Sequence, residues 1–321
     1  MGTNDVTTEP ASAGTAAAAG SWPPGPVRML KGGFALVVGI FWVLFIRRHW
    51  DALATANWSL DLSWCTAAFL IFAIYFLGQG TGWVMIARAM GYRLPMSEGM
   101  ATWLLSMPAR YVPGNLWHIA ARISLAAKHQ VAPEGVVVSS TAEQLLMVLS
   151  AACLGLAWLP SWAGATVTPW AVALFLACLA GLQPPVLRFL LRLGSRLLGR
   201  TVPPINLGYR QMASLFVWYT LVNALNGLAF ALLATAAVRP AQTLWPAFGS
   251  AYCLAYVVGY VSFLTPSGIG VREAALASML SVYLPAPTAL ALTLLARLLS
   301  TAGEAVAVLA VGLPTVVAKR P

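Results

Sequence analysis

Long apolar runs, separated by short polar connections, occupy most of the chain. Several of them approach or exceed the roughly 20 residues that a helix needs to cross a bilayer. The alternating ten-residue segments of a transmembrane barrel are absent. The pattern therefore predicts an all-α, polytopic membrane bundle. The expected spans cover about residues 29–46, 62–90, 136–159, 169–187, 212–238, 244–264 and 287–311.

Helix-breaking residues interrupt two apolar segments. Pro113 and Gly114 separate a short apolar piece at 98–107 from a second piece that ends near residue 127. Because proline removes a backbone donor and each piece is too short to cross comfortably, we expect a re-entrant helical hairpin here.

A second break of the same kind follows the 244–264 run. It contains Pro266, Gly268 and Gly270, and leads into a short helix at 271–284 that either re-enters or spans. With both breaks included, the sequence predicts about seven or eight spans and two broken or re-entrant segments.

The composition excludes a soluble globular protein. Hydrophobic residues make up 60% of the chain and charged residues only 9%, whereas about a quarter of a soluble chain is charged. The net charge of +10 comes from basic residues in short loops. That placement favours topology signals and anionic lipid headgroups, and we expect no nucleic-acid partner.

The arginine-rich loop at 188–210 contains no acidic residue, so the positive-inside rule places it in the cytoplasm. Counting spans back from it puts the N-terminus in the cytoplasm too, and we expect an inner (plasma) membrane protein. Residues 1–27 are rich in Ala, Gly, Thr and Pro and predict a disordered tail. A transmembrane domain at 28–315 and a short basic tail at 316–321 complete the expected organisation.

Charged residues occur at both breaks and inside two spans. A half-helix that begins inside the membrane directs backbone N–H groups and an arginine fork toward an anion, so Arg110, Arg122 and Arg272 are candidate phosphate contacts. The alternative is that these arginines pair with Glu143, Glu273 or Glu304. Three such acids against four arginines, Arg297 being the fourth, leave one positive charge over.

Other motifs have structural interpretations. Gly78, Gly80 and Gly82 lie in an apolar helix with no preceding strand, which favours close helix packing over a nucleotide loop. Trp103, Trp117 and Tyr111 are expected to be interfacial anchors. Carboxylates are not clustered for Mg²⁺, no P-loop occurs, and His and Cys show no ligand spacing, so we expect neither a metal nor a cofactor.

These motifs together resemble a known family, the flippase-like membrane domain shared with the lysylphosphatidylglycerol synthase transmembrane region. The resemblance covers about residues 30–315. It rests on Arg110-Tyr-Val-Pro-Gly-Asn-Leu-Trp117 with Arg122, on Thr141-Ala-Glu-Gln144, on Thr265-Pro-Ser-Gly-Ile-Gly-Val-Arg-Glu273, and on Arg297. It implies movement of lipids, aminoacylated phosphatidylglycerol among them, between leaflets. We expect the chain to depart from the family in lacking the soluble aminoacyl-transferase domain, and it carries Gln144 where an Arg commonly follows the Glu.

The sequence therefore predicts a lipid flippase or transporter for an anionic or polyprenyl-linked headgroup, not an enzyme. The alternatives are a metal-free membrane transferase that uses His118 or Glu143 as a base, and a non-transporting partner of a lipid- or glycan-biosynthesis enzyme. The candidate substrate-binding residues are Arg110, Pro113, Gly114, Trp117, His118, Arg122, Glu143, Pro266, Gly268, Gly270, Arg272, Glu273 and Arg297.

Overall fold

The computed structural model describes residues 60–111, 117–158, 208–261 and 270–312, together with a few isolated positions between 47 and 185. All four ranges belong to one compact unit, Ile46–Pro321, and the other unit, Met1–Phe45, lies outside the described residues. The regular elements of these ranges are helical and none of them is a strand. The prediction of an all-helical bundle is confirmed.

The first half of the bundle is a long helix, two short helices and a second long helix. Asp61 caps the first of these by accepting a hydrogen bond from the Ser63 backbone N–H at 3.0 Å. Gly91, with φ +95°, makes the turn that follows it. The elements are α3 (Leu62–Ala89), α4 (Met96–Ser106), the 3-10 turn η1 (Met107–Tyr111), α5 (Trp117–Ala126), η2 (Ala127–His129) and α6 (Pro133–Trp158).

The second half also has four main helices, of which the second is longer than its counterpart in the first half. Its first helix ends at Val238, and the next residue, Arg239, has the left-handed φ of 46° and precedes Pro240. The elements are α10 (Tyr209–Val238), η3 (Gln242–Leu244), α11 (Trp245–Val261), α12 (Val271–Leu280), α13 (Ala286–Ala307) and the π-helical turn η5 (Val308–Gly312). In the described ranges, these bounds agree with the predicted spans to within a few residues.

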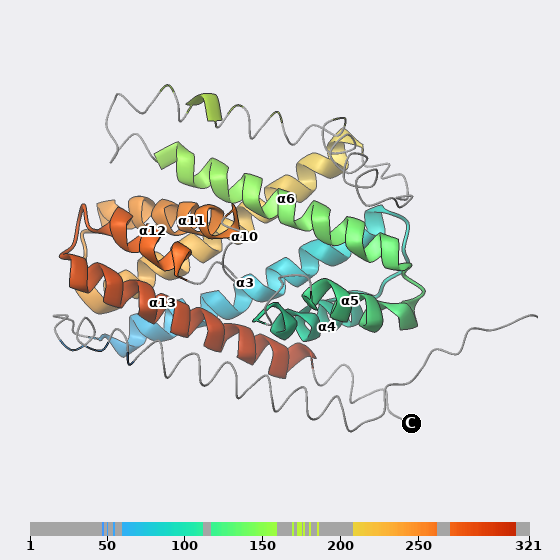
Figure 1. Ribbon diagram of the computed structural model, residues 1–321, viewed down its shortest axis with the longest axis horizontal. Helices are drawn as coiled ribbons and strands as arrows, with labels where there is room; N and C mark the ends of the chain where they lie inside the picture. Colours follow the sequence, from blue (N-terminus) through green and yellow to red (C-terminus); the bar gives the residue numbers. More distant parts are fainter. Residues whose placement is uncertain are drawn as a thin grey trace, which may run out of the picture. The chain divides into compact units, whose positions relative to one another are not determined.

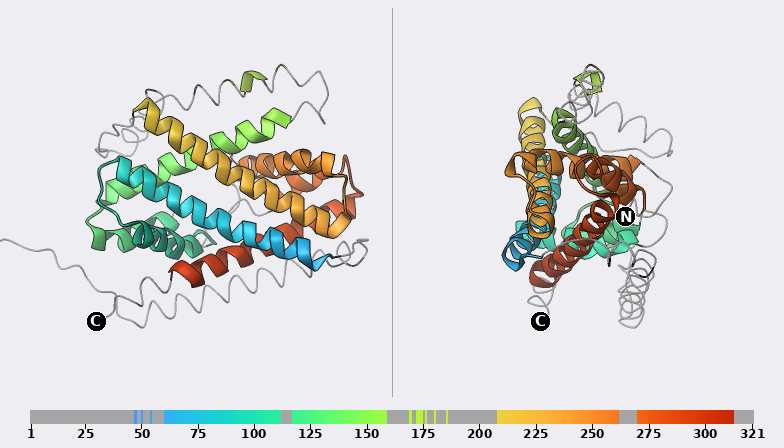
Figure 2. Two further views of the ribbon diagram at one scale, coloured as in Figure 1. Left: turned by 180° about the vertical axis from the view of Figure 1, so that it is seen from behind. Right: turned by 90° about the vertical axis from the view of Figure 1, so that its left-hand side faces the viewer.

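The two halves run in opposite directions. The first helices of the halves, α3 and α10, pack against each other along their length (Figure 2). Gly78 of α3 faces Val222, and Gly82 faces Tyr219, so residue numbers rise along one helix while they fall along the other. The Asp61 backbone N–H also donates to the carbonyl of Ala236, near the far end of α10, at 3.0 Å. The first helices of the two halves are therefore antiparallel, the relationship expected for an inverted repeat of the kind found in many secondary transporters.

Contacts between the halves follow the same symmetry. Helix α6 of the first half packs on α11 of the second, and η5, which continues α13, packs on α4 of the first half. Within each half the third main helix lies against the fourth, α5 against α6 and α12 against α13. The pairs α4/α5 and α11/α12 lie toward opposite ends of the bundle (Figure 1).

Small residues allow the close approach of α3 to its neighbours. A Cβ on Gly82 would lie 2.6 Å from the Tyr219 ring, and one on Gly78 would lie 2.9 Å from Val222. A Cβ on Gly80 would make only an ordinary contact, 3.5 Å from Trp103. The interpretation as helix-packing residues is confirmed for Gly78 and Gly82.

Helices long and apolar enough to cross a membrane are present in both halves. Within the described ranges there are five: Leu62–Ala89, Pro133–Ala157, Tyr209–Val238, Gln242–Val261 and Ala286–Gly312. The expected spans at 29–46 and 169–187 lie outside the described residues. The total of about seven or eight spans stays a prediction.

Candidate functional site

A fully buried ion pair joins the two helices that follow the first break. Arg122 of α5 and Glu143 of α6 are both 0% exposed, and Nη1 of the arginine lies 2.7 Å from Oε2 of the glutamate. The structure therefore places Arg122 in the ion pair that the sequence offered as the alternative to phosphate contact. Gln144 does not remove the pair, because the cation comes from α5 and not from the neighbouring position.

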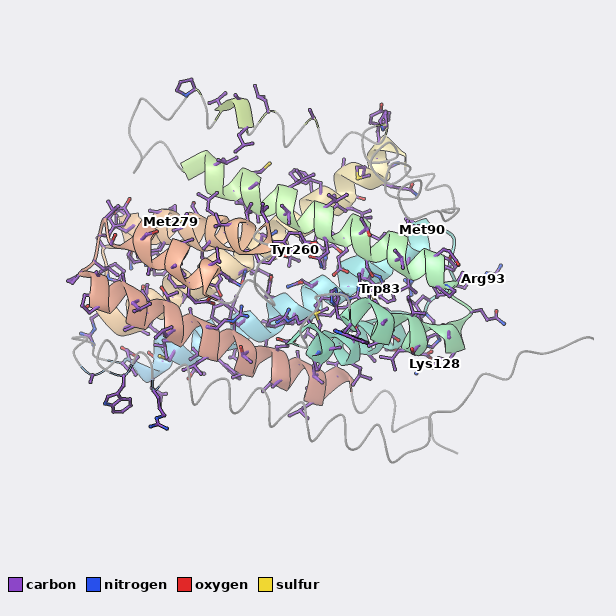
Figure 3. The ribbon with its side chains drawn as sticks, in the orientation of Figure 1. Trp83, Met90, Arg93, Lys128, Tyr260 and Met279 are labelled. Carbon is purple, nitrogen blue, oxygen red and sulfur yellow. The ribbon has the colours of Figure 1, made fainter. Side chains whose placement is uncertain are left out.

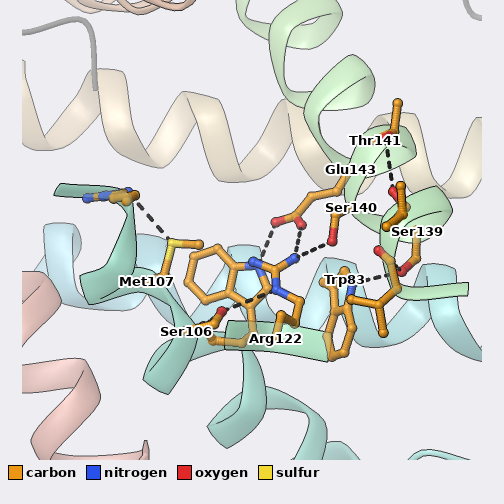
Figure 4. A network of polar contacts seen from close by, with 12 residues as sticks. Trp83, Ser106, Met107, Arg122, Ser139, Ser140, Thr141 and Glu143 are labelled. Carbon is orange, nitrogen blue, oxygen red and sulfur yellow. Dashed lines mark hydrogen bonds and ion pairs between the residues drawn. The ribbon is translucent and has the colours of Figure 1, made fainter. Parts of the chain in front are cut away.

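Hydrogen bonds surround this pair on several sides. Trp103 Nε1 donates to Glu143 Oε1 at 2.6 Å, and Arg122 donates to Ser140 Oγ at 3.0 Å and to Ser106 Oγ at 3.2 Å. Figure 4 shows the guanidinium between Ser106 on one side and Ser140 with Glu143 on the other. Such hydrogen bonds offset the free-energy cost of desolvating the two charges, and they link α4, α5 and α6 to one another.

The side chain of Trp103 has a different role from the one predicted. Its 0% exposure and its bond to Glu143 show that the interfacial-anchor interpretation is wrong for this residue. Because its indole N–H is a donor only, burial against a carboxylate satisfies it as well as interfacial water would. Trp117 is 54% exposed, and the side chain of Tyr111 lies outside the described residues.

A second ion pair connects the two halves of the bundle. Arg110 of η1 pairs with Glu304 of α13, and their side chains are 23% and 5% exposed. The guanidinium of Arg110 also lies 5.7 Å from the ring centroid of Phe76. Because η1 belongs to the first half and α13 to the second, this pair is a contact across the repeat.

The third pair repeats the first with its charges reversed. Glu273 of α12 lies 3.7 Å from Nε of Arg297 on α13, so the short helix now carries the acid and the long helix the base. The other oxygen of Glu273 accepts a hydrogen bond at 2.7 Å from the N–H of Gly270, whose φ is +90°. Glu273 thus fixes the beginning of α12 as well as its contact with α13.

The remaining arginine has a different environment. Within the described ranges, no carboxylate lies within ion-pair distance of the partly buried Arg272. Its guanidinium carbon lies 4.6 Å from the ring centroid of Tyr252 and 5.7 Å from that of Tyr256. A Cβ on Gly259 would lie 2.8 Å from Cβ of Arg272, so this glycine permits the close contact of α11 with α12. Tyrosine faces leave the in-plane N–H groups of the guanidinium able to bind an acceptor.

Tyrosines bring the charges of the two halves near one another. Tyr256 of α11 lies near Arg272 of its own half and near Arg110 of the other half. Tyr75 of α3 lies near the same two arginines. His118 is partly buried, lies near Arg110, and has an Nδ1 without a hydrogen-bond partner among the described residues. The polar centre is therefore shared between the repeats.

Not every predicted residue can be placed. Pro113, Gly114, Pro266 and Gly268 lie outside the described residues. Sequence reasoning missed Ser106, Ser140, Tyr252 and Tyr256 as parts of the site. One signal for the tyrosines was available, because positions 252, 256 and 260 recur at the four-residue spacing that puts them on one face of a helix. Within the described ranges, no cluster of three His, Cys, Asp or Glu side chains could hold a metal ion.

Apolar helices of spanning length, packed around buried ion pairs, define an integral, polytopic helical membrane protein. The family model described as lysylphosphatidylglycerol synthase TM region matches residues 31–307. The chain belongs to this family of membrane proteins associated with lipid handling. A search of the curated proteins found no match.

Proposed function

We propose that this protein is a lipid flippase of the inner (plasma) membrane, with a cytoplasmic N-terminus, that moves a lipid with an anionic headgroup between leaflets. The observation that carries the proposal is the partly buried Arg272, which forms no ion pair with an acid of the described residues although three other arginines of the bundle do. An arginine left without a counter-ion in a membrane is costly, so it favours an anionic ligand.

The geometry around Arg272 suits a phosphate. Two tyrosine rings hold the guanidinium in place while its edge can donate two parallel hydrogen bonds to phosphate oxygens. The headgroup would pass through the polar centre between the repeats, and the acyl chains would stay in the bilayer. The inverted repeat supports this route, because transporters of this kind bind substrate where the two repeats meet.

The environment of Glu143 favours transport over catalysis. A general base must be able to take a proton, but both oxygens of Glu143 already accept hydrogen bonds, from Trp103 and from Arg122. We therefore propose that the protein is not an enzyme. An enzyme of lipid or glycan biosynthesis would supply its substrate, in which case the two proteins are partners.

Reconstitution into vesicles tests the proposal. Purified full-length protein is placed in liposomes that contain a trace of fluorescent phosphatidylglycerol, and a membrane-impermeant reductant quenches the outer leaflet. The assay is run with and without an imposed proton gradient. In vesicles that contain the protein, we expect the reductant to quench more fluorescent lipid than the outer leaflet holds. In protein-free vesicles it should quench the outer-leaflet fraction alone.

Two results would overturn the proposal. The first is the absence of lipid movement under all of these conditions. The second is a covalently modified lipid when the protein is given lipid and an activated donor, which would make the protein a transferase. Mass spectrometry of the extracted lipids distinguishes that product from redistribution alone.

A further inference from the structure

Resting on the proposed function, we infer that the transported lipid is an unmodified phosphodiester with one negative charge, and neither an aminoacylated lipid nor a diphosphate. The inference follows from the pairing of the carboxylates in the bundle. It names a substrate class that leaves out lysylphosphatidylglycerol, the lipid to which the family description refers.

The first step concerns the acids that could bind an ammonium group. Between residues 62 and 312 the sequence contains five acidic residues, and the structure describes all of them. Glu98 pairs with His129 at 3.0 Å, and Glu134 is exposed in the first turn of α6. The other three are Glu143, Glu273 and Glu304, each paired with an arginine.

The second step concerns the headgroup of an aminoacylated lipid. A lysyl ester adds two ammonium groups to the single negative charge of the phosphodiester, so the headgroup becomes net positive. Binding such a headgroup beside Arg272 requires a carboxylate for the ammonium groups, and each buried carboxylate already has a partner. Taking one of them would leave a buried arginine unpaired, which is strongly unfavourable.

The third step concerns the size of the negative charge. Arg272 contributes one positive charge in excess of the ion pairs, and a phosphodiester contributes one negative charge. The two charges cancel inside the membrane. A diphosphate would leave negative charge uncompensated in a medium where an unpaired charge is costly. The segments 112–116 and 262–269 contain no charged residue that could change this balance.

One assay with three lipids tests the inference on full-length protein in liposomes. The probes are fluorescent phosphatidylglycerol, fluorescent lysylphosphatidylglycerol and a fluorescent polyprenyl diphosphate, each at the same trace level. We expect phosphatidylglycerol to cross at least about tenfold faster than either of the others, because a charge imbalance of about 1.4 kcal/mol already gives that factor.

Two substitutions of Arg272 and one control locate the selectivity. Arg272→Gln should remove most of the phosphatidylglycerol transport, and Arg272→Lys should retain part of it, because it keeps the charge but loses the planar fork. Arg93→Gln is the matched control, since Arg93 is exposed at the end of the bundle (Figure 3) and should transport like the wild type. If Arg272→Gln does not fold, Arg272→Lys still tests the role of the planar fork, and the comparison of the three lipids on the wild type still tests the charge selectivity.

The outcomes separate this inference from the proposed function. Equal or faster movement of lysylphosphatidylglycerol or of the diphosphate overturns the charge selectivity and leaves the flippase proposal standing. Movement of none of the three lipids overturns the proposed function itself. Unchanged selectivity in Arg272→Gln also overturns the inference, because the charge balance would then not depend on this residue.

Discussion

Arg122 and Glu143 are in contact through Nη1 and Oε2 at 2.7 Å, and neither side chain is exposed to solvent. The ion pair therefore holds α5 against α6. Changing Arg122 to Met alone should lower stability by about 3–5 kcal/mol, because it leaves a buried carboxylate without its cation. The thermal unfolding of the purified protein in detergent measures the loss.

A double variant distinguishes pairing from mere proximity. Arg122→Met combined with Glu143→Met removes both charges and should recover much of the stability that the single change loses. If the double variant instead loses as much stability as the two single variants lose together, the ion pair is not the source of the stability. Arg93→Gln again serves as the control for removing an exposed positive charge.

The pair of Arg110 with Glu304 joins the two repeats, and we expect it to matter for transport more than for folding. Arg110→Glu places two carboxylates together and should abolish lipid movement. The exchange Arg110→Glu with Glu304→Arg restores opposite charges and should recover part of it. Full transport by Arg110→Glu alone would show that this contact has no part in the cycle.

The glycines of α3 provide a matched pair of packing variants. Gly82→Ala should destabilise the protein by about 1–3 kcal/mol, because the new methyl group collides with the fully buried ring of Tyr219. Gly80→Ala should be neutral or stabilising, by up to about 1 kcal/mol, since its contact with Trp103 is ordinary and alanine is the better helix former. Equal unfolding temperatures for the two variants would contradict the described packing of α3 on α10.

The direction of insertion is tested by labelling. A single cysteine placed within 189–209 should react only from the cytoplasmic side, and one placed within 161–167 only from outside. Figure 3 shows Arg93 and Lys128 at one end of the bundle and Met279 toward the other, and the positive-inside rule assigns the first end to the cytoplasm. The reverse labelling pattern would invert the whole topology.

Sequence reasoning predicted the helices of the described ranges well, because in a bilayer an apolar run of sufficient length has few alternatives to a helix. It also predicted that three acids facing four arginines leave one positive charge. It could not assign which arginine pairs with which acid. Arg110 and Glu304 are 194 positions apart, and only the packing of the two halves of the bundle brings them together.

The errors have similar causes. Trp103 fits the general preference of tryptophan for the interface, but the preference is overridden where a buried carboxylate can accept the indole hydrogen bond. Gln144 stands where an arginine commonly follows the family's Glu, which weakened the assignment of a local ion pair, and Glu143 pairs instead with Arg122, 21 positions earlier. In both cases the deciding contact lies on another helix, which no local pattern reveals.

The most direct test measures lipid affinity and stability on the same two variants. Arg272→Gln should weaken the binding of phosphatidylglycerol about tenfold or more, the effect of losing a charge-assisted contact of roughly 1.5–3 kcal/mol, with little change in unfolding temperature. Arg122→Gln should do the opposite, lowering the unfolding temperature while its folded fraction binds the lipid like the wild type. Wild-type affinity in Arg272→Gln would contradict the account.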